Sequence, residues 1–171
     1  PAAPTVPIAP EEEEKWRAAI GKNADLYLQR WRTMEAKGSS ISWNWPACLF
    51  NLFWFGYRKM WLPMIGVIGA MLVFAVIGGA SGEAGGQVTS LLSILLSFAT
   101  GGFGNHLYRK QTAKLVAETS VLPRAAQLDA LRTGGGVSVP ALAILLAVFG
   151  VLTLLAVIGT VAEQAQQNQL D

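Results

Sequence analysis

The sequence predicts an all-α integral membrane protein with three transmembrane helices, an N-terminal amphipathic helix and a short interfacial or re-entrant helix. Apolar residues make up 52% of the 171 positions and charged residues only 14%, whereas soluble domains carry about 25% charged residues. Three apolar windows lie at residues 61–80, 88–107 and 139–161. Each is about 20 residues long, which as a helix matches the roughly 30 Å hydrocarbon core of a bilayer.

The positions of Lys and Arg predict how the spans are oriented. Eight of the thirteen cations precede the first window, and the other five lie between the second and third windows. Residues 81–87 and the tail at 162–171 contain no cation. Because loops rich in Lys and Arg are retained on the cytoplasmic side of a membrane, we expect a cytoplasmic N-terminus and a periplasmic C-terminal tail.

Two segments lead up to the membrane entry. Residues 1–10, PAAPTVPIAP, predict an extended Pro/Ala-rich linker, since a signal peptide would need a basic start and an apolar core. Residues 11–38 predict a cytoplasmic amphipathic helix that ends near Gly38. Its apolar stripe consists of Trp16, Ile20, Tyr27, Trp31 and Met34. This stripe can dock on lipid headgroups or on the protein's own apolar segments, and the sequence favours neither.

Residues 42–60, SWNWPACLFNLFWFGYRKM, predict a short helix followed by a basic turn. From Pro46 to Tyr57 there are twelve residues, or about 18 Å of helix, too short to cross a bilayer. We therefore expect an interfacial or re-entrant helix with tryptophans at headgroup depth: Trp43, Trp45, Trp54 and Trp61. Arg58 and Lys59 would then reach lipid phosphates, and a basic pocket for an anionic ligand is the alternative.

Small residues recur at helical spacing in all three windows and predict helix-packing faces. They are Gly66, Ala70, Ala75 and Gly79 in the first window, Ser90, Ser93, Ser97, Gly101 and Gly104 in the second, and Ala143, Ala147 and Gly150 in the third. Such faces serve contacts among the three helices or with a partner, although Gly is also frequent in membrane helices in general.

The segment GGFGNHLYRK, residues 101–110, ends the second span. We expect Asn105, His106 and Tyr108 to hydrogen-bond to nearby backbone at the membrane interface. Arg109 and Lys110 would lie beside the helix C-terminus or the anionic leaflet. Residues 109–136 predict a cytoplasmic helical loop with a break before Pro123.

The sequence predicts no catalytic residue, no cofactor, no metal site and no nucleic-acid partner. With one His and one Cys, neither a nucleophilic catalytic set nor a site of clustered His and Cys ligands can be assembled. The three windows contain no Asp, Glu, Lys or Arg. Because ionisable groups inside membranes mark ion and proton pathways, this absence argues against a coupled transporter or pump.

Three stretches carry a resemblance to a known family: IGKNADLYLQRW, SWNWPACLFNLFWFGYRKMW and GGFGNHLYRKQTAKLV. Over residues 20–116 the chain resembles a family of small bacterial inner-membrane proteins catalogued only as a domain of unknown function. That family shows the motifs SWNWxAF, YRKMW and GNxxY. This chain departs from the pattern at Cys48 and at Asn51. The resemblance implies a bacterial inner membrane and no known activity.

These observations favour a non-enzymatic accessory or structural subunit that packs against a larger membrane protein complex. The alternative is a self-associating membrane protein that organises or binds anionic lipid at the cytoplasmic leaflet. The expected partners are therefore membrane lipids together with a larger complex or further copies of the chain. A membrane enzyme or carrier that uses Asn105, His106 and Tyr108 ranks last.

Overall fold

The computed structural model describes residues 10–167, and within them every regular element is a helix and there are no strands. The elements are α1 (Pro10–Ile20), α2 (Ala24–Ala36), α3 (Trp45–Tyr57), α4 (Trp61–Ala80), the 3-10 turn η1 (Gly82–Ala84), α5 (Gly85–Glu118), α6 (Arg124–Gly134) and α7 (Val139–Gln167). Residues 1–9 of the predicted linker and residues 168–171 of the predicted tail lie outside the described residues.

Three helices are long and apolar enough to cross a membrane, which agrees with the predicted fold class. Helix α4 has the bounds predicted for the first span. Helix α5 has 34 residues and continues well past residue 107, where the second span was expected to end. Nothing in GNHLYRKQTAKLVAE breaks a helix, so the apolar span runs directly into a polar helical extension.

The N-terminal region forms two helices where one amphipathic helix was predicted. Gly21 and Asn23, between α1 and α2, have left-handed backbone conformations with φ of +62° and +68°. Two such residues close together cannot continue a right-handed helix. As a result α1 packs against α6 and α5, while α2 packs against α5.

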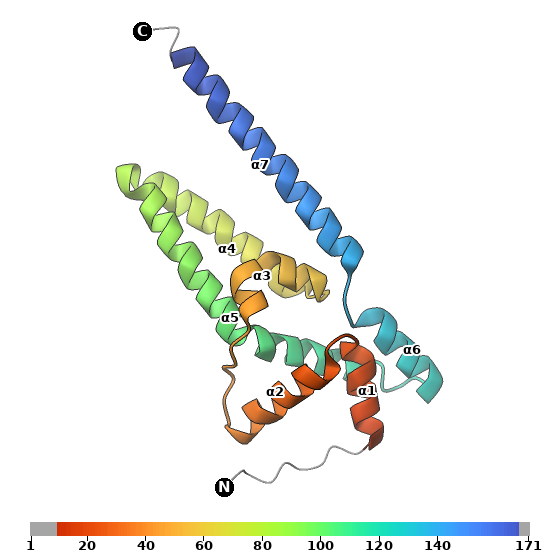
Figure 1. The fold of residues 1–171 in the computed structure, drawn as a ribbon. Helices are drawn as coiled ribbons and strands as arrows, with labels where there is room; N and C mark the ends of the chain where they lie inside the picture. Colours follow the sequence, from red (N-terminus) through yellow and green to blue (C-terminus); the bar gives the residue numbers. More distant parts are fainter. Residues whose placement is uncertain (1–9, 168–171) are drawn as a thin grey trace.

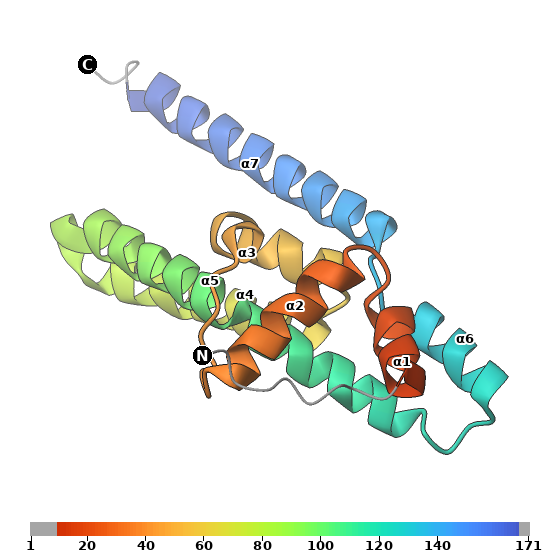
Figure 2. The same cartoon turned by 60° about the horizontal axis from the view of Figure 1, so that its bottom comes forward.

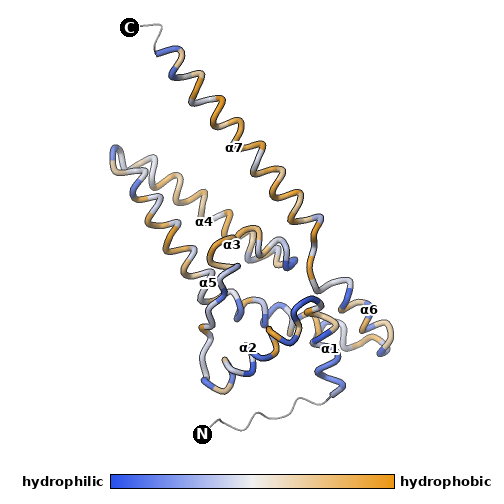
Figure 3. The backbone as a smooth tube through the Cα atoms, viewed as in Figure 1, coloured by the Kyte–Doolittle hydropathy of each residue, from blue (hydrophilic) through white to orange (hydrophobic). Residues whose placement is uncertain are grey.

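We define the helical cap as α1, α2, α6, the part of α5 after Gly104, the turns that join them, and Lys37 at the end of α2. Figure 3 shows polar colours in α1, α2 and α6, and mostly apolar colours along α4, α7 and the first half of α5. The buried core lies where the cap meets the short helix α3. Its members are Ile20, Tyr27, Leu28, Trp31, Met34, Ala47, Trp54, Phe55, Met60, Val67 and Tyr108.

The three long helices do not form one bundle. Figures 1 and 2 show α4 and α5 side by side as a hairpin, with α7 running separately. Within residues 10–167, α7 packs only against α3. The first turns of α7 make this contact, because Phe53 and Phe149 stack edge to face at 5.6 Å between ring centroids. None of the apolar stretch of α7 is buried.

Candidate functional site

Arg58 lies inside the protein, at the C-terminal end of α3, with 3% of its surface exposed. Its terminal nitrogens donate hydrogen bonds to the backbone carbonyls of Ile20 (3.3 Å) and Lys22 (3.2 and 3.3 Å), and to the hydroxyl of Tyr108 (3.2 Å). The guanidinium carbon lies 4.5 Å from the ring centroid of Tyr27 and 5.0 Å from that of Tyr108. Carbonyl dipoles and aromatic faces therefore surround this cation.

This position corrects the prediction that Arg58 reaches lipid phosphates. The turn between α1 and α2 supplies the two carbonyls and covers the guanidinium. Among the residues that the structure describes, no carboxylate pairs with Arg58, so its positive charge stays uncompensated. The positive potential extends to its surroundings, because low-dielectric protein screens charge poorly.

The turn that follows Arg58 is a Schellman motif with an unusual residue in it. The Lys59 amide donates to the carbonyl of Gly56 (3.1 Å), and the Met60 amide donates to the carbonyl of Phe55 (2.8 Å). Lys59 occupies the left-handed position of the motif with φ of +56°, where glycine is the usual residue. Helix α2 ends in the same motif with Gly38 at that position, φ +57°.

A buried polar network joins the segment before α3 to α5. The Asn44 side-chain amide donates to the Asn105 side-chain oxygen at 2.9 Å, and the Trp31 indole donates to the Asn105 carbonyl at 3.0 Å. The Asn105 side-chain amide donates to the carbonyl of Ser42 at 3.2 Å. Asn44 also caps α3, since its side-chain oxygen accepts the amide of Ala47 at 3.2 Å.

These contacts replace the local hydrogen bonds expected for Asn105 and Tyr108. Asn105 joins residues about sixty positions away, and the Tyr108 hydroxyl donates to the carbonyl of Ile20 at 3.4 Å. The helix already satisfies the nearby backbone groups of α5, so these side chains bond to other elements. His106 is half-buried beside them.

Two glycines bring α3 onto α5. A Cβ atom at Gly104 would lie 2.9 Å from the Cβ of Ala47, and one at Gly101 would lie 2.7 Å from the Cβ of Cys48. Both gaps are tighter than van der Waals contact, so only glycine permits this approach. The Ser42 and Asn44 amides also donate to the carbonyls of Gly102 (3.0 Å) and Gly101 (2.8 Å).

The other predicted packing residues do not lie against the rest of the chain in the same way. Gly66, Gly79 and Gly150 have no atom within 4 Å of an added Cβ. Exposed or half-buried positions are also occupied by Ala70, Ala75, Ser90, Ser93, Ser97, Ala143 and Ala147. The close contact in the α4–α5 hairpin is made instead by Gly78 and Gly85, which the sequence analysis missed. The small-residue run GGASGEAGG, which brackets the turn, was the available signal.

The predicted interface aromatics divide into two groups. Trp43, Trp45 and Trp61 are 36%, 62% and 49% exposed. Trp54 and Tyr108 are buried in the core, with ring centroids 6.1 Å apart, which corrects their predicted place among lipid headgroups. Helix α3 thus has a buried face toward α5 and an exposed apolar face.

A groove of about 710 Å³ opens between the α3–α4 turn, the start of α4, the second half of α5 and the end of α6. We call it the basic groove. Four cations line it, Arg58, Lys59, Lys110 and Lys114, together with one carboxylate, Glu118. Its apolar lining includes Trp61, Leu62, Pro63, Leu107 and Leu115. The nearby Arg109 points elsewhere, with its guanidinium 3.3 Å from the Glu35 carboxylate.

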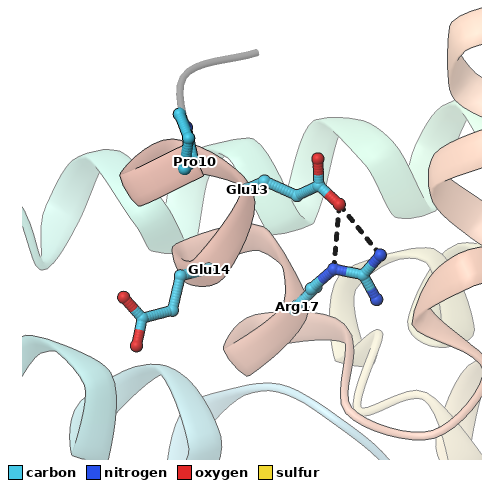
Figure 4. Close-up of a pocket in the computed structure, with 4 residues that line it drawn as sticks. All are labelled: Pro10, Glu13, Glu14 and Arg17. Carbon is cyan, nitrogen blue, oxygen red and sulfur yellow. Dashed lines mark hydrogen bonds and ion pairs between the residues drawn. The ribbon is translucent and has the colours of Figure 1, made fainter. Parts of the chain in front are cut away.

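Surface ion pairs hold α1 in place. Figure 4 shows the Arg17 guanidinium hydrogen-bonded to the Glu13 carboxylate. The same carboxylate pairs with Arg32 of α2 at 2.9 Å. The hydrogen bond from Arg17, followed by the charge of Arg32, lowers the pKa of Glu13 below its ordinary value. Glu14 lies apart from this pair in Figure 4 and accepts from Arg124 of α6 at 2.6 Å. These carboxylates already have cationic partners within the chain.

The polar side chains of the site differ in what they can offer to a ligand. Over residues 10–167, no three side chains from His, Cys, Asp and Glu come together as metal ligands would. The buried polar side chains Arg58, Asn44 and Asn105 connect helices and present no nucleophile. The basic groove, in contrast, offers several charged groups to a ligand.

No curated protein and no solved structure matches this chain. The sequence model of one family, described as "Protein of unknown function (DUF2628)", matches residues 12–114. That range holds both partners of the Asn44–Asn105 pair, Arg58 and the Gly101–Gly104 contact with α3, and ends at Lys114 of the basic groove. The chain belongs to this family of unknown function.

Proposed function

We propose that this protein is a non-enzymatic accessory subunit that packs against a larger protein complex of the bacterial inner membrane. The observation that carries the proposal is the isolation of α7. This helix has 29 residues, and within the described chain it packs only against α3. Helices in lipid associate through close packing and hydrogen bonds, since lipid offers no hydrophobic driving force between them.

The two sides of α7 differ in a way that supports this role. With 3.6 residues per turn, Leu145 and Phe149 share the face that meets α3, and Ala143, Ala147 and Gly150 fall on the opposite face. All three small residues are exposed. A stripe of small residues lets another helix approach closely, and here it points away from the chain's own helices. A membrane-embedded partner chain fits that stripe.

Isolation from native membranes in mild detergent tests the proposal. We expect the wild-type chain to remain associated with a larger membrane protein, and Ala147→Leu to lose that association because leucine fills the approach path. Ala156→Leu is the matched control, because Ala156 is exposed on the other side of α7. Recovery of a lone 18.3 kDa protomer, or equal loss in both variants, overturns the proposal. Recovery only as copies of itself favours the self-associating alternative instead.

A further inference from the structure

We propose that the basic groove binds the phosphate-bearing headgroup of an anionic phospholipid. Lys59, Lys110 and Lys114 supply the charge for the phosphate, and Trp61 and Leu62 contact the lipid's apolar part. This inference goes beyond the proposed function, since it assigns a ligand to a site that the packing of α7 does not involve.

Charge complementarity is the first argument. Four cations and one carboxylate line the groove. The carboxylate, Glu118, lies 3.6 Å from the Lys114 ammonium, and both side chains are mostly exposed, so this pair is weak and can open. Lys110 and Lys114 stand four residues apart, on one face of α5. Arg58, at the inner side, adds a buried positive charge that pairs with no carboxylate among the described residues.

The backbone at Lys59 is the second argument. A non-glycine residue in the left-handed region has a strained backbone, and residues with strained backbone are frequent at binding and active sites. Lys59 holds that conformation at the turn into α4. Its ammonium donates to the carbonyl of Thr133 at 2.7 Å, which fixes it at the edge of the groove. An ammonium has three donors, so two remain for a phosphate.

Depth in the membrane selects a lipid over a soluble anion. Helix α4 starts at Trp61 and its 20 residues are all apolar or small, so its first turn lies where the hydrocarbon core meets the headgroups. Trp61 and Leu62 are 49% and 80% exposed there. A ligand in the groove thus meets cations on one side and an apolar surface on the other. A phospholipid has that two-part chemistry, and inorganic phosphate lacks the apolar part.

The test uses the full chain in nanodiscs of phosphatidylcholine with or without phosphatidylglycerol, and counts retained lipids by native mass spectrometry. We expect phosphatidylglycerol to be retained by the wild type. Each of Lys59→Gly, Lys110→Gln and Lys114→Gln should weaken retention about fivefold, because one cation near an anionic headgroup contributes about that factor. Millimolar inorganic phosphate should not displace the lipid.

The matched control removes three cations from elsewhere on the cap: Lys15→Gln, Lys22→Gln and Lys37→Gln. A groove variant that combines Lys59→Gly, Lys110→Gln and Lys114→Gln has the same net charge as this control. The control should retain phosphatidylglycerol like the wild type. The proposed site is wrong if the groove variant retains as much phosphatidylglycerol as the wild type. It is also wrong if the control loses as much lipid as the groove variant, because binding would then depend only on the total surface charge. Displacement by inorganic phosphate overturns the choice of a lipid.

Discussion

Lys59 and Gly38 form a natural comparison, since both sit at the left-handed position of a Schellman motif, with φ of +56° and +57°. An added Cβ at Gly38 meets no atom within 4 Å, so a side chain there would change only the backbone strain. At Lys59 the strain is offset in part by the hydrogen bond to Thr133. The same motif thus tolerates a lysine in one place and uses glycine in the other.

We expect Gly38→Lys to lower the free energy of unfolding by about 1 kcal/mol, because an L-residue in left-handed backbone costs about that much. Lys59→Gly should change it by less than about 0.5 kcal/mol, since relief of strain and loss of an exposed hydrogen bond oppose each other. Thermal unfolding in detergent, followed by circular dichroism, measures both. Strong destabilisation by Lys59→Gly would contradict the strain argument.

We expect Arg58→Gln to lower the free energy of unfolding by about 3 kcal/mol, because it removes charge-assisted hydrogen bonds and two cation–π contacts. Arg109→Gln is the control, since Arg109 makes a single pair with an exposed Glu35 and should cost less than about 1 kcal/mol. The same unfolding experiment compares them. Equal effects would mean that Arg58 is not integral to the core.

Among the elements, the contact of α3 with α5 depends on the smallest side chains at the crossing. The GGFG run lets Ala47 and Cys48 reach the α5 backbone, and this approach places Asn44 within hydrogen-bond distance of Asn105. Close backbone packing and a buried amide pair therefore support each other. A substitution that separates the two backbones, or one that removes either asparagine side chain, would therefore disturb both the packing and the amide pair.

We expect Gly104→Ala to destabilise the protein by about 2 kcal/mol, because its Cβ would meet that of Ala47 at 2.9 Å and push α3 away. Gly66→Ala is the matched control in a span helix. Its Cβ meets nothing within 4 Å, so the variant should be stabilised by about 1 kcal/mol through helix propensity. Unfolding midpoints in detergent would show the opposite signs, and equal shifts would contradict the predicted contact.

The docking of α1 should depend on pH through Glu13. Its pKa is lowered by Arg17 and Arg32, so the stabilisation is complete above the ordinary value of 4.5 and is lost as pH falls through the lowered pKa. Trp16 of α1 contacts Trp31 of α2 edge to face with ring centroids 5.6 Å apart, so tryptophan fluorescence reports the loosening. Glu13→Gln should remove this acid transition, and an unchanged transition would assign it to another group.

On the scale of the whole molecule, most Lys and Arg residues lie in the cap, and the apolar surface lies on the long helices. The thirteen cations belong to the cap or to the α3–α4 turn at residues 58–60. Figure 1 shows the α4–α5 turn and the end of α7 pointing away from α1, α2 and α6. This separation is the form expected for a membrane protein whose Lys and Arg residues all lie on one side.

We expect cysteines at Glu83 and Gln166 to react with an impermeant thiol reagent added to the periplasmic face of intact cells. A cysteine at Asp129 of α6 should react only after permeabilisation. The background is low because the native Cys48 is 8% exposed, and Cys48→Ala removes it while keeping the Cβ near Gly101. Protection of residues 83 and 166 together with labelling of 129 would reverse the orientation.

Much of the fold was predictable because it depends on local properties. Hydropathy summed over a window gave the three spans, and the bounds of α4 agree with the prediction at both ends. The break before Pro123 follows from the missing proline amide and appears between α5 and α6. The division of α1 from α2 was missed, although Gly21 and Asn23 are residue types that adopt left-handed backbone readily and so gave a signal for it.

The candidate site was less predictable because its residues are far apart in the chain. Arg58 meets a tyrosine 50 positions away, and Asn44 meets an asparagine 61 positions away. Window composition carries no information about such pairs. Arg58 was therefore predicted to reach lipid phosphates, because it follows an apolar segment. The fold instead encloses its guanidinium between the rings of Tyr27 and Tyr108.

By itself, the sequence determined an all-helical chain, three segments able to span a bilayer, and cations gathered outside them. Those features follow from the free energy of transferring individual side chains, which adds along the chain. Only the tertiary structure decided that Arg58 and Trp54 are interior, that Lys59, Lys110 and Lys114 share one groove, and that α7 is separate from the hairpin. These outcomes depend on close packing between segments that are far apart in the chain. The composition of a short stretch of sequence does not specify which distant segments it will contact.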